Sequence, residues 1–186
     1  MEHLIKTERL RLQPLNESDI KFFQELAEKP EYYEYDRDIA QSNDEIEKEC
    51  RWFIERANAL PDEGAIRWIV LHNDVRIGEI HITCNWEKTR EWEIGWHLFP
   101  EYWGKGFATE AAKAAIKYAF THFKIHRLIA LCCTENIRSA ALAERAGMFK
   151  DGRMRENKLI KGTYYDEYVY SILKREVMLI EAGRGI

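Results

Sequence analysis

The stretch from Trp103 to Thr109 has a composition that suits phosphate binding. It reads Trp-Gly-Lys-Gly-Phe-Ala-Thr and lies directly before a segment with apolar residues at helical spacing. Glycine lets the backbone approach a ligand closely, and the first turn of a helix offers unpaired N–H groups with a partial positive charge. Lys105 adds a point charge. These features predict a diphosphate-binding loop, although a turn that only packs the helix would use the same glycines.

Two familiar phosphate loops can be compared with this stretch. The sequence lacks the P-loop pattern, in which Gly and four further residues precede Gly-Lys and a Ser or Thr. The dinucleotide fingerprint needs a third glycine, and Thr109 stands in its place. Glu135, however, follows the next expected strand, where that fingerprint has an acid for the ribose. An oxidoreductase that uses a dinucleotide therefore remains an alternative.

The elements around the loop predict a parallel crossover unit. Apolar residues alternate with polar or small ones over residues 91–99, which indicates a half-buried strand. Residues 107–123 have apolar side chains at helical spacing, and residues 127–133 form an apolar run typical of a strand buried on both faces. A strand, a helix and a buried strand in this order predict parallel pairing. A further helix is expected from Ile137 to Ala146, ended by Gly147.

The remaining segments predict antiparallel hairpins. Asn73-Asp74 is a two-residue turn signal within residues 66–84, and a change of apolar parity after Gly78 indicates a β-bulge. Two final strands, about 148–158 and 164–174, turn at Lys161-Gly162.

The N-terminal third predicts a short strand at residues 10–14 and two helices. Asn16 or Ser18 caps the first helix, and Ser42 or Asn43 opens the second. The predicted fold class is α/β: a mixed sheet with helices on both faces, in a single domain of residues 1–186.

Composition narrows the function further. The 186 residues suit one domain, and a net charge of −4 without a basic block argues against nucleic-acid binding. The start of the chain has no signal-peptide pattern, and no apolar run approaches a membrane span. The four cysteines show no metal-ligand spacing and are expected to be reduced. We therefore expect a cytoplasmic protein without a metal and without membrane contact.

The chain resembles the GNAT N-acetyltransferase superfamily, in particular its RimJ/RimL-type branch. The resemblance covers most of the chain and rests on these segments: Glu8-Arg9-Leu10-Arg11-Leu12, Glu93-Ile94-Gly95-Trp96, Pro100 to Ala111, Asn136 with Ser139, Leu142 to Met148, and Gly162, Tyr164, Asp166 and Tyr170. The family loop begins with Gln or Arg. Any two residues follow, then a Gly, any one residue, and finally a Gly or Ala. Gly106 and Ala108 match this pattern, whereas Trp103 replaces the Gln or Arg and removes one side-chain contact to phosphate.

The resemblance implies acetyl-CoA as cosubstrate and direct acetyl transfer to a primary amine, either a protein N-terminal α-amine or a small amine. It implies a GNAT-like fold in which the strand before the loop parts from the strand after the helix, with the pantetheine arm in the wedge. The resemblance also implies a monomer or a homodimer. The implied cofactor-binding residues are Leu98, Phe99, Trp103, Gly104, Lys105, Gly106, Phe107, Ala108, Thr109, Asn136 and Ser139.

Ser139 matches the serine that this branch places near the CoA sulfur, and we expect it to protonate the thiolate; a plain first-turn helix residue is the alternative. Glu93 is the favoured base, with a surface salt bridge as its alternative. His97 lies on the same strand face, but roughly 13 Å away, and is a separate candidate. Some relatives carry a base just before the last hairpin, where this chain has Lys158, with Glu156 two residues earlier.

The resemblance also places the acceptor wall near Tyr33 and Trp52, and Tyr170 on the last strand is a third candidate for substrate contact. Packing is the alternative for each of them. Cys132 is expected to be an inert thiol in a buried strand. A third class of function, a CoA-binding sensor without catalysis, would keep the loop and show no turnover.

Overall fold

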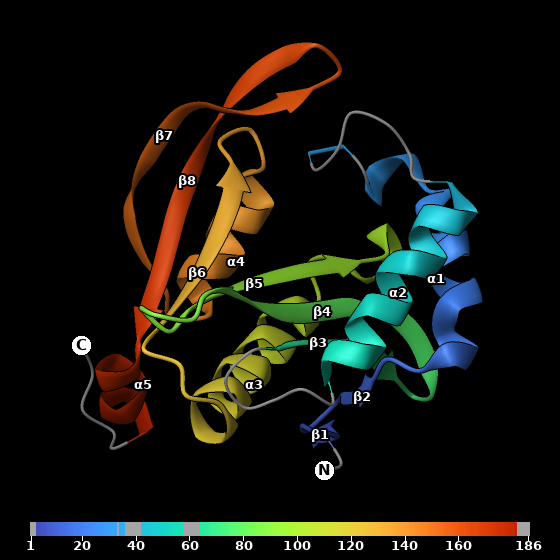
Figure 1. The fold of residues 1–186 in the computed structure, drawn as a ribbon, viewed down its shortest axis with the longest axis horizontal. Helices are drawn as coiled ribbons and strands as arrows, with labels where there is room; N and C mark the ends of the chain where they lie inside the picture. Colours follow the sequence, from blue (N-terminus) through green and yellow to red (C-terminus); the bar gives the residue numbers. More distant parts are fainter. Residues whose placement is uncertain (1–2, 33, 36–41, 58–63, 182–186) are drawn as a thin grey trace.

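The computed structural model describes residues 3–32, 34–35, 42–57 and 64–181, which contain one eight-stranded mixed sheet (Figure 1). The sheet order is β1-β2-β3-β4-β5-β6-β8-β7. The strands are β1 (Ile5–Lys6), β2 (Arg11–Pro14), β3 (Ala65–His72), β4 (Val75–Trp86), β5 (Glu91–Leu98), β6 (Arg127–Cys133), β7 (Phe149–Ile160) and β8 (Thr163–Leu173). The helices are α1 (Ile20–Ala27), α2 (Asn43–Ala57), α3 (Phe107–His122), α4 (Ile137–Arg145) and α5 (Lys174–Glu181). No helix in these ranges is both long and apolar enough to cross a bilayer.

Helices cover both faces of the sheet, as the sequence predicts. The apolar side chains of α1 and α2 form one core with one face of β3. Those of α3 and α4 form a larger core with the opposite face, which includes Trp68, Trp92 and Tyr170. β3 therefore presents alternate residues to two different helical layers.

The predicted turns and bulge are confirmed. Asn73 and Asp74 both have positive φ, 48° and 62°, which is the backbone of the two-residue turn that suits the strand twist. Val70 pairs with Gly78 and Leu71 pairs with Arg76, so Ile77 is the extra residue of a bulge. This bulge is the reason that the apolar parity of β4 changes after Gly78. It also decides which β4 side chains face α2.

Strands β5 and β6 part after a short parallel contact. They pair only where residues 91–93 lie opposite residues 127–129, although β5 has eight residues and β6 seven. Beyond that point β6 continues along β8 over its whole length, while β5 stays with β4. Figure 1 shows the two strands diverging from their shared start. The divergence opens a wedge in the middle of the sheet, with one unpaired strand edge on each side.

One strand and one α-helix are additional to those predicted from the sequence. β1 is only two residues long and pairs with β2. α5 follows β8 directly, and the Glu176 side chain accepts from the Leu173 N–H at 2.8 Å. A short 3-10 turn, Glu17–Asp19, also precedes α1, with Asn16 and Asp19 forming the capping box.

Candidate active site

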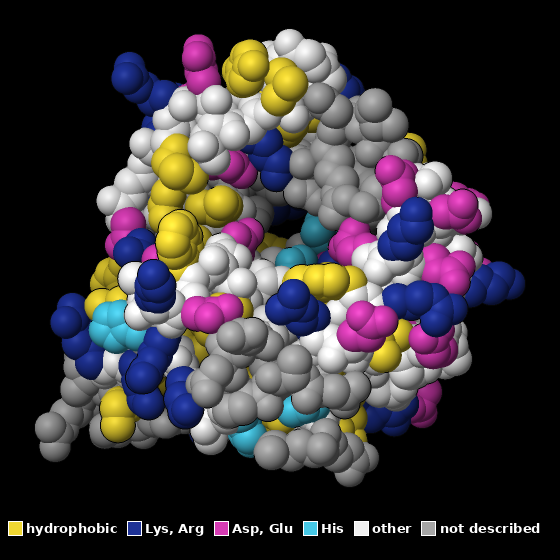
Figure 2. Space-filling model, viewed as in Figure 1, with side chains coloured by type: hydrophobic (Ala, Val, Ile, Leu, Met, Phe, Trp, Pro, Cys, Tyr) yellow, Lys and Arg dark blue, Asp and Glu magenta, His cyan; other side chains and the backbone are white. Residues whose placement is uncertain are grey.

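A cavity of about 950 Å³ occupies the wedge between β5 and β6. Figure 2 shows a hollow at this place, with charged and histidine side chains around it. Its walls come from the second half of β5, the loop before α3, the end of β6, the first turns of α4, and side chains of β3, β4 and α2. This volume is in the range of small-molecule and cofactor sites.

The loop before α3 lines this cavity, and within it the Trp103 N–H donates to the Pro100 carbonyl at 3.1 Å. Gly104 and Gly106 have φ values of 72° and 80°, in the left-handed region that favours glycine. Gly106 is the N-cap of α3, and no side chain in the described part of the chain caps this helix. The N–H groups of the first turn are therefore available to a ligand, and the helix start adds a partial positive charge.

Side chains from the N-terminal segment hold this loop in place. Arg9 donates to the Lys105 carbonyl at 3.1 Å and forms an ion pair with Glu110 at 2.6 Å. Thr7 also donates to Glu110, at 2.6 Å. Burial pushes the pKa of Glu110 upward, but the hydrogen bonds from Thr7 and Arg9 outweigh it and lower the pKa, so this carboxylate stays ionised.

The side chain of Trp103, which stands where the family loop has Gln or Arg, hydrogen-bonds to the backbone of the protein itself. Its indole N–H donates to the Leu98 carbonyl at 2.7 Å. The Phe99 N–H donates to the Ile77 carbonyl at 2.9 Å, on the β4 side. The two backbone groups expected to meet pantetheine thus already have protein partners, and Trp96 is the next residue whose backbone faces the open edge of β5.

Two arginines of α4 supply positive charge that the sequence reasoning missed. The Arg138 guanidinium lies 4.1 Å from the centre of the Trp103 ring, and the Arg145 Nε donates to the Thr109 hydroxyl at 3.4 Å. Both line the cavity. Their spacing of seven residues, two helical turns, is the signal that could have placed them on one face of α4.

Ser139 lies at the centre of the wedge. Its hydroxyl oxygen accepts from the Trp96 indole N–H at 3.1 Å and lies 3.3 Å from the Cys132 sulfur. The Asn136 side chain accepts from the Ser139 N–H at 3.0 Å, which is the N-cap role considered for Asn136. Burial raises the pKa of the Cys132 thiol to about 11, so Cys132 is protonated near neutral pH and is a poor nucleophile.

A buried polar cluster faces the cavity from the α2 side of the sheet. Glu79 has no exposed surface; one of its oxygens lies 2.8 Å from His97 Nδ1 and the other 3.1 Å from His81 Nδ1. The Arg67 Nε lies 3.5 Å from Glu79, and another Arg67 nitrogen bonds Glu49 at 2.6 Å. We refer to Glu79, His81, His97 and Arg67 as the imidazole cluster.

The imidazole cluster keeps its carboxylate charged. Burial alone would raise the pKa of Glu79, but the charges of His81 and Arg67 and the hydrogen bonds from both histidines outweigh burial and lower it. Among the residues that the structure describes, no group of His, Cys, Asp and Glu side chains could hold a metal ion.

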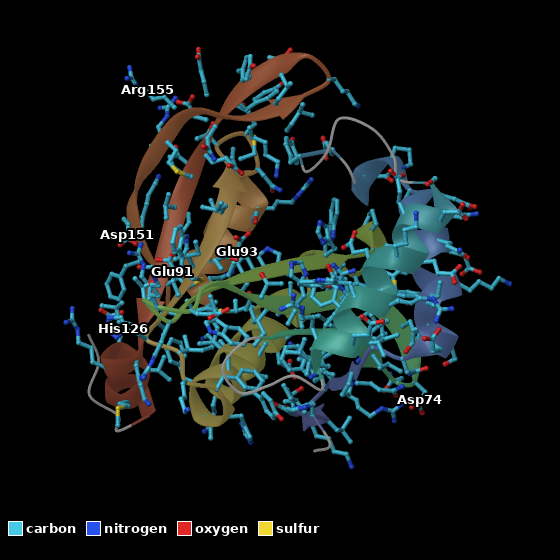
Figure 3. The ribbon with its side chains drawn as sticks, in the orientation of Figure 1. Asp74, Glu91, Glu93, His126, Asp151 and Arg155 are labelled. Atoms are coloured by element: carbon cyan, nitrogen blue, oxygen red, sulfur yellow. The ribbon has the colours of Figure 1, made fainter. Side chains whose placement is uncertain are left out.

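Glu93, the residue favoured as base, lies near the closed end of the wedge. Figure 3 labels it beside the point where β5 and β6 part. It lines the cavity and accepts from the Asn85 side-chain amide at 2.8 Å. At the opposite wall, Lys158 lies 3.7 Å from Glu167, and both line the cavity.

The three expected substrate contacts fare differently. Tyr33 lies outside the described residues. Trp52 is 40% exposed and packs on Phe53, and it is Phe53 that lines the cavity. Tyr170 is buried, donates to Glu144 at 3.0 Å, and has a raised pKa because of burial and that carboxylate. Its packing role, which was the alternative, agrees with this position.

Comparisons with known proteins identify the family. Residues 9–149 match the family described as "Acetyltransferase (GNAT) domain". The chain is 33% identical over 178 residues to the uncharacterized N-acetyltransferase p20 of Bacillus licheniformis. This alignment covers 91% of this chain and 96% of that protein.

Solved structures share the fold. Spermidine N-acetyltransferase from Vibrio cholerae, in complex with CoA and spermine, superposes with a TM-score of 0.80 at 24% identity, over 92% of this chain and 99% of that one. RimL, a ribosomal alpha-N-protein acetyltransferase in complex with CoA, superposes with a TM-score of 0.81 at 19% sequence identity. The match covers 91% of this chain and 97% of that one. The family match leaves the dinucleotide-dependent oxidoreductase without support. The chain belongs to the GNAT acetyltransferase family and is an N-acetyltransferase, for which acetyl-CoA is the acyl donor and a primary amine the acceptor.

Proposed function

We propose that acetyl-CoA binds in the wedge between β5 and β6, with its diphosphate at residues 103–109 and its pantetheine arm along the open edge of β5. The observation that carries this proposal is the parting of the two strands after three paired residues. An open strand edge can hydrogen-bond an extended amide-containing arm, as a further strand would. The uncapped start of α3, with Arg138 and Arg145 nearby, suits the diphosphate.

We propose that Ser139 protonates the departing thiolate. Its oxygen accepts from Trp96, and the protonated Cys132 thiol is close enough to donate as well. With both lone pairs engaged, the single hydroxyl proton of Ser139 is the one left to donate into the wedge. A sulfur at the end of the pantetheine arm is the acceptor that this geometry suits, and Asn136 holds the helix turn that carries Ser139.

The acceptor amine approaches from the α2 side of β5. Several carboxylates line the cavity and favour a cation, the form in which a primary amine arrives near neutral pH. They include Glu31, Glu34, Glu49, Glu79 and Glu93. Spermidine and a protein N-terminus are the acceptors that the names of the two structural neighbours give for those proteins. We propose that the acceptor of this protein is a cationic amine of this kind, and that the reaction uses no metal.

The test is thiol release from acetyl-CoA, measured over a panel of spermidine, spermine and peptides with free N-termini. Release that depends on an amine, with mass spectrometry showing one acetyl group on that amine, supports the proposal. CoA binding by calorimetry without release for any amine contradicts it and favours the sensor. An acetylated protein intermediate would contradict direct transfer.

A further inference from the structure

The imidazole cluster suggests how the acceptor amine loses its proton, and this inference rests on the proposed function. We propose that His81 takes the proton from the amine, while Glu79 and Gly95 position its ring. Arg67, His81 and Gly95 lie directly opposite one another on β3, β4 and β5, in one row across the sheet. In the next row, Glu79 lies opposite His97.

Gly95 lets the His81 ring reach across β5. A Cβ atom built on Gly95 would lie 2.5 Å from Cε1 and 2.6 Å from Nε2 of His81, far closer than van der Waals contact. The ring therefore lies over the Gly95 backbone, with its Nε2 edge on the strand that borders the wedge. Both residues line the cavity. Any side chain at position 95 would occupy the place of this imidazole.

Glu79 determines which nitrogen of His81 can accept a proton. The ionised, fully buried carboxylate can only accept hydrogen bonds, so the Nδ1 atom 3.1 Å away carries the hydrogen. In the neutral ring this leaves Nε2 as the basic nitrogen. A carboxylate behind an imidazole also stabilises the imidazolium that forms when the ring takes a proton.

The positions of His81 and Ser139 suit a proton acceptor and a proton donor for one reaction. His81 packs against Phe53 of α2, with ring centroids 5.6 Å apart, and meets β5 at Gly95. Ser139 comes from α4 and bonds Trp96, the next residue of β5. The two groups thus approach neighbouring residues of β5 from opposite faces. Glu93 lies where β5 is still paired with β6.

The protons balance in this scheme. A protonated amine gives one proton to His81 Nε2, which later releases it to solvent. The neutral nitrogen attacks the thioester carbon, the C–N bond forms and the C–S bond breaks. The thiolate takes the Ser139 proton, and the second proton of the nitrogen restores the serine. The charged and titratable groups around His81 are Glu79 on its own strand, Arg67 on β3, Glu49 on α2, and Glu93 and His97 on β5.

The sharpest test is Gly95→Ala, because it displaces the imidazole without changing any titratable group. We expect kcat to fall by about 100-fold, the usual range for loss of a general base. CoA affinity by calorimetry should stay within about twofold, because the imidazole lies on the acceptor side of β5. Gly152→Ala is the matched control, since that glycine has open space around it on β7. Unchanged kcat in Gly95→Ala would overturn the inference.

His81→Gln gives a second route to the same answer and should also lower kcat by about 100-fold, with His122→Gln at the exposed end of α3 as its control. Glu79→Gln should move the acidic limb of kcat/KM to lower pH, because the imidazolium loses the carboxylate that stabilises it. A purely structural role would lower activity equally at all pH values.

Three outcomes separate this inference from the proposed function. Wild-type protein that acetylates no amine in the panel rejects the proposed function. Active wild-type protein with full activity in His81→Gln rejects only the base. If the pH profile of kcat/KM loses its acidic limb in Glu93→Gln but keeps it in His81→Gln, the general base is Glu93 and not His81.

Discussion

The loop before α3 and the imidazole cluster lie on two sides of one cavity and are built in opposite ways. The loop offers backbone N–H groups, made available by two glycines with positive φ and an uncapped helix start. The cluster offers side chains from three strands, joined through one buried carboxylate. A diphosphate is a fixed, doubly charged ligand that backbone dipoles can hold, whereas moving a proton requires a titratable group.

This difference predicts two kinds of sensitivity. Where the backbone binds, a change in backbone conformation should weaken binding strongly and loss of a side chain should matter little. Where side chains do chemistry, loss of a single functional group should lower turnover while binding persists.

Ser139→Ala should produce the largest change, a fall in kcat of about 100-fold, because a positioned general acid contributes at least that much. The KM for acetyl-CoA should change by less than about threefold, since the hydroxyl acts mainly on the leaving group. Steady-state kinetics with the preferred amine measures both constants. Ser171→Ala removes a buried serine of β8 that does not line the cavity, and serves as control. Wild-type turnover in Ser139→Ala would remove this residue from the chemistry.

Gly106→Val should raise the KM for acetyl-CoA by about tenfold or more with a smaller effect on kcat. Its φ of 80° costs a side-chain-bearing residue about 1–2 kcal/mol, and more for a β-branched one, so the loop must change conformation. Gly162→Val is the control, because Gly162 has φ of 75° in the β7–β8 turn, away from the cavity. An unchanged KM would show that the amides of this loop do not hold the cosubstrate.

The elements around the proposed cofactor site could be predicted because their sequence signals are local. The glycine loop, the helix after it and β6 at residues 127–133 each lie within a short stretch of sequence, and the structure has them where they were expected. The bulge beside Gly78 could also be predicted, because the apolar residues of the strand change from one face to the other at that point. Family resemblance supplied the parting of β5 and β6, which periodicity alone does not contain.

The acceptor side could not be predicted because its groups meet only through strand register. In the sequence, Glu79 is one polar residue of an alternating strand, and the residues near it do not indicate that it is buried. Its partner His97 lies 18 residues away and becomes its neighbour only when β4 and β5 pair. Trp52 stays a prediction for substrate contact; adjacent helical residues point about 100° apart, and its neighbour Phe53 is the one that lines the cavity.

Trp103→Phe should produce the smallest effect and the sharpest test of the backbone-binding side. The change keeps an aromatic ring beneath Arg138 but removes the indole N–H that donates to the Leu98 carbonyl. A hydrogen bond of this kind contributes about 1 kcal/mol, so the KM for acetyl-CoA should rise by no more than about fivefold. Kinetics would be compared with Trp86→Phe, which alters an exposed tryptophan outside the cavity. A fall in kcat as large as that of Ser139→Ala would contradict the contrast, because a side chain of the loop would then take part in the chemistry.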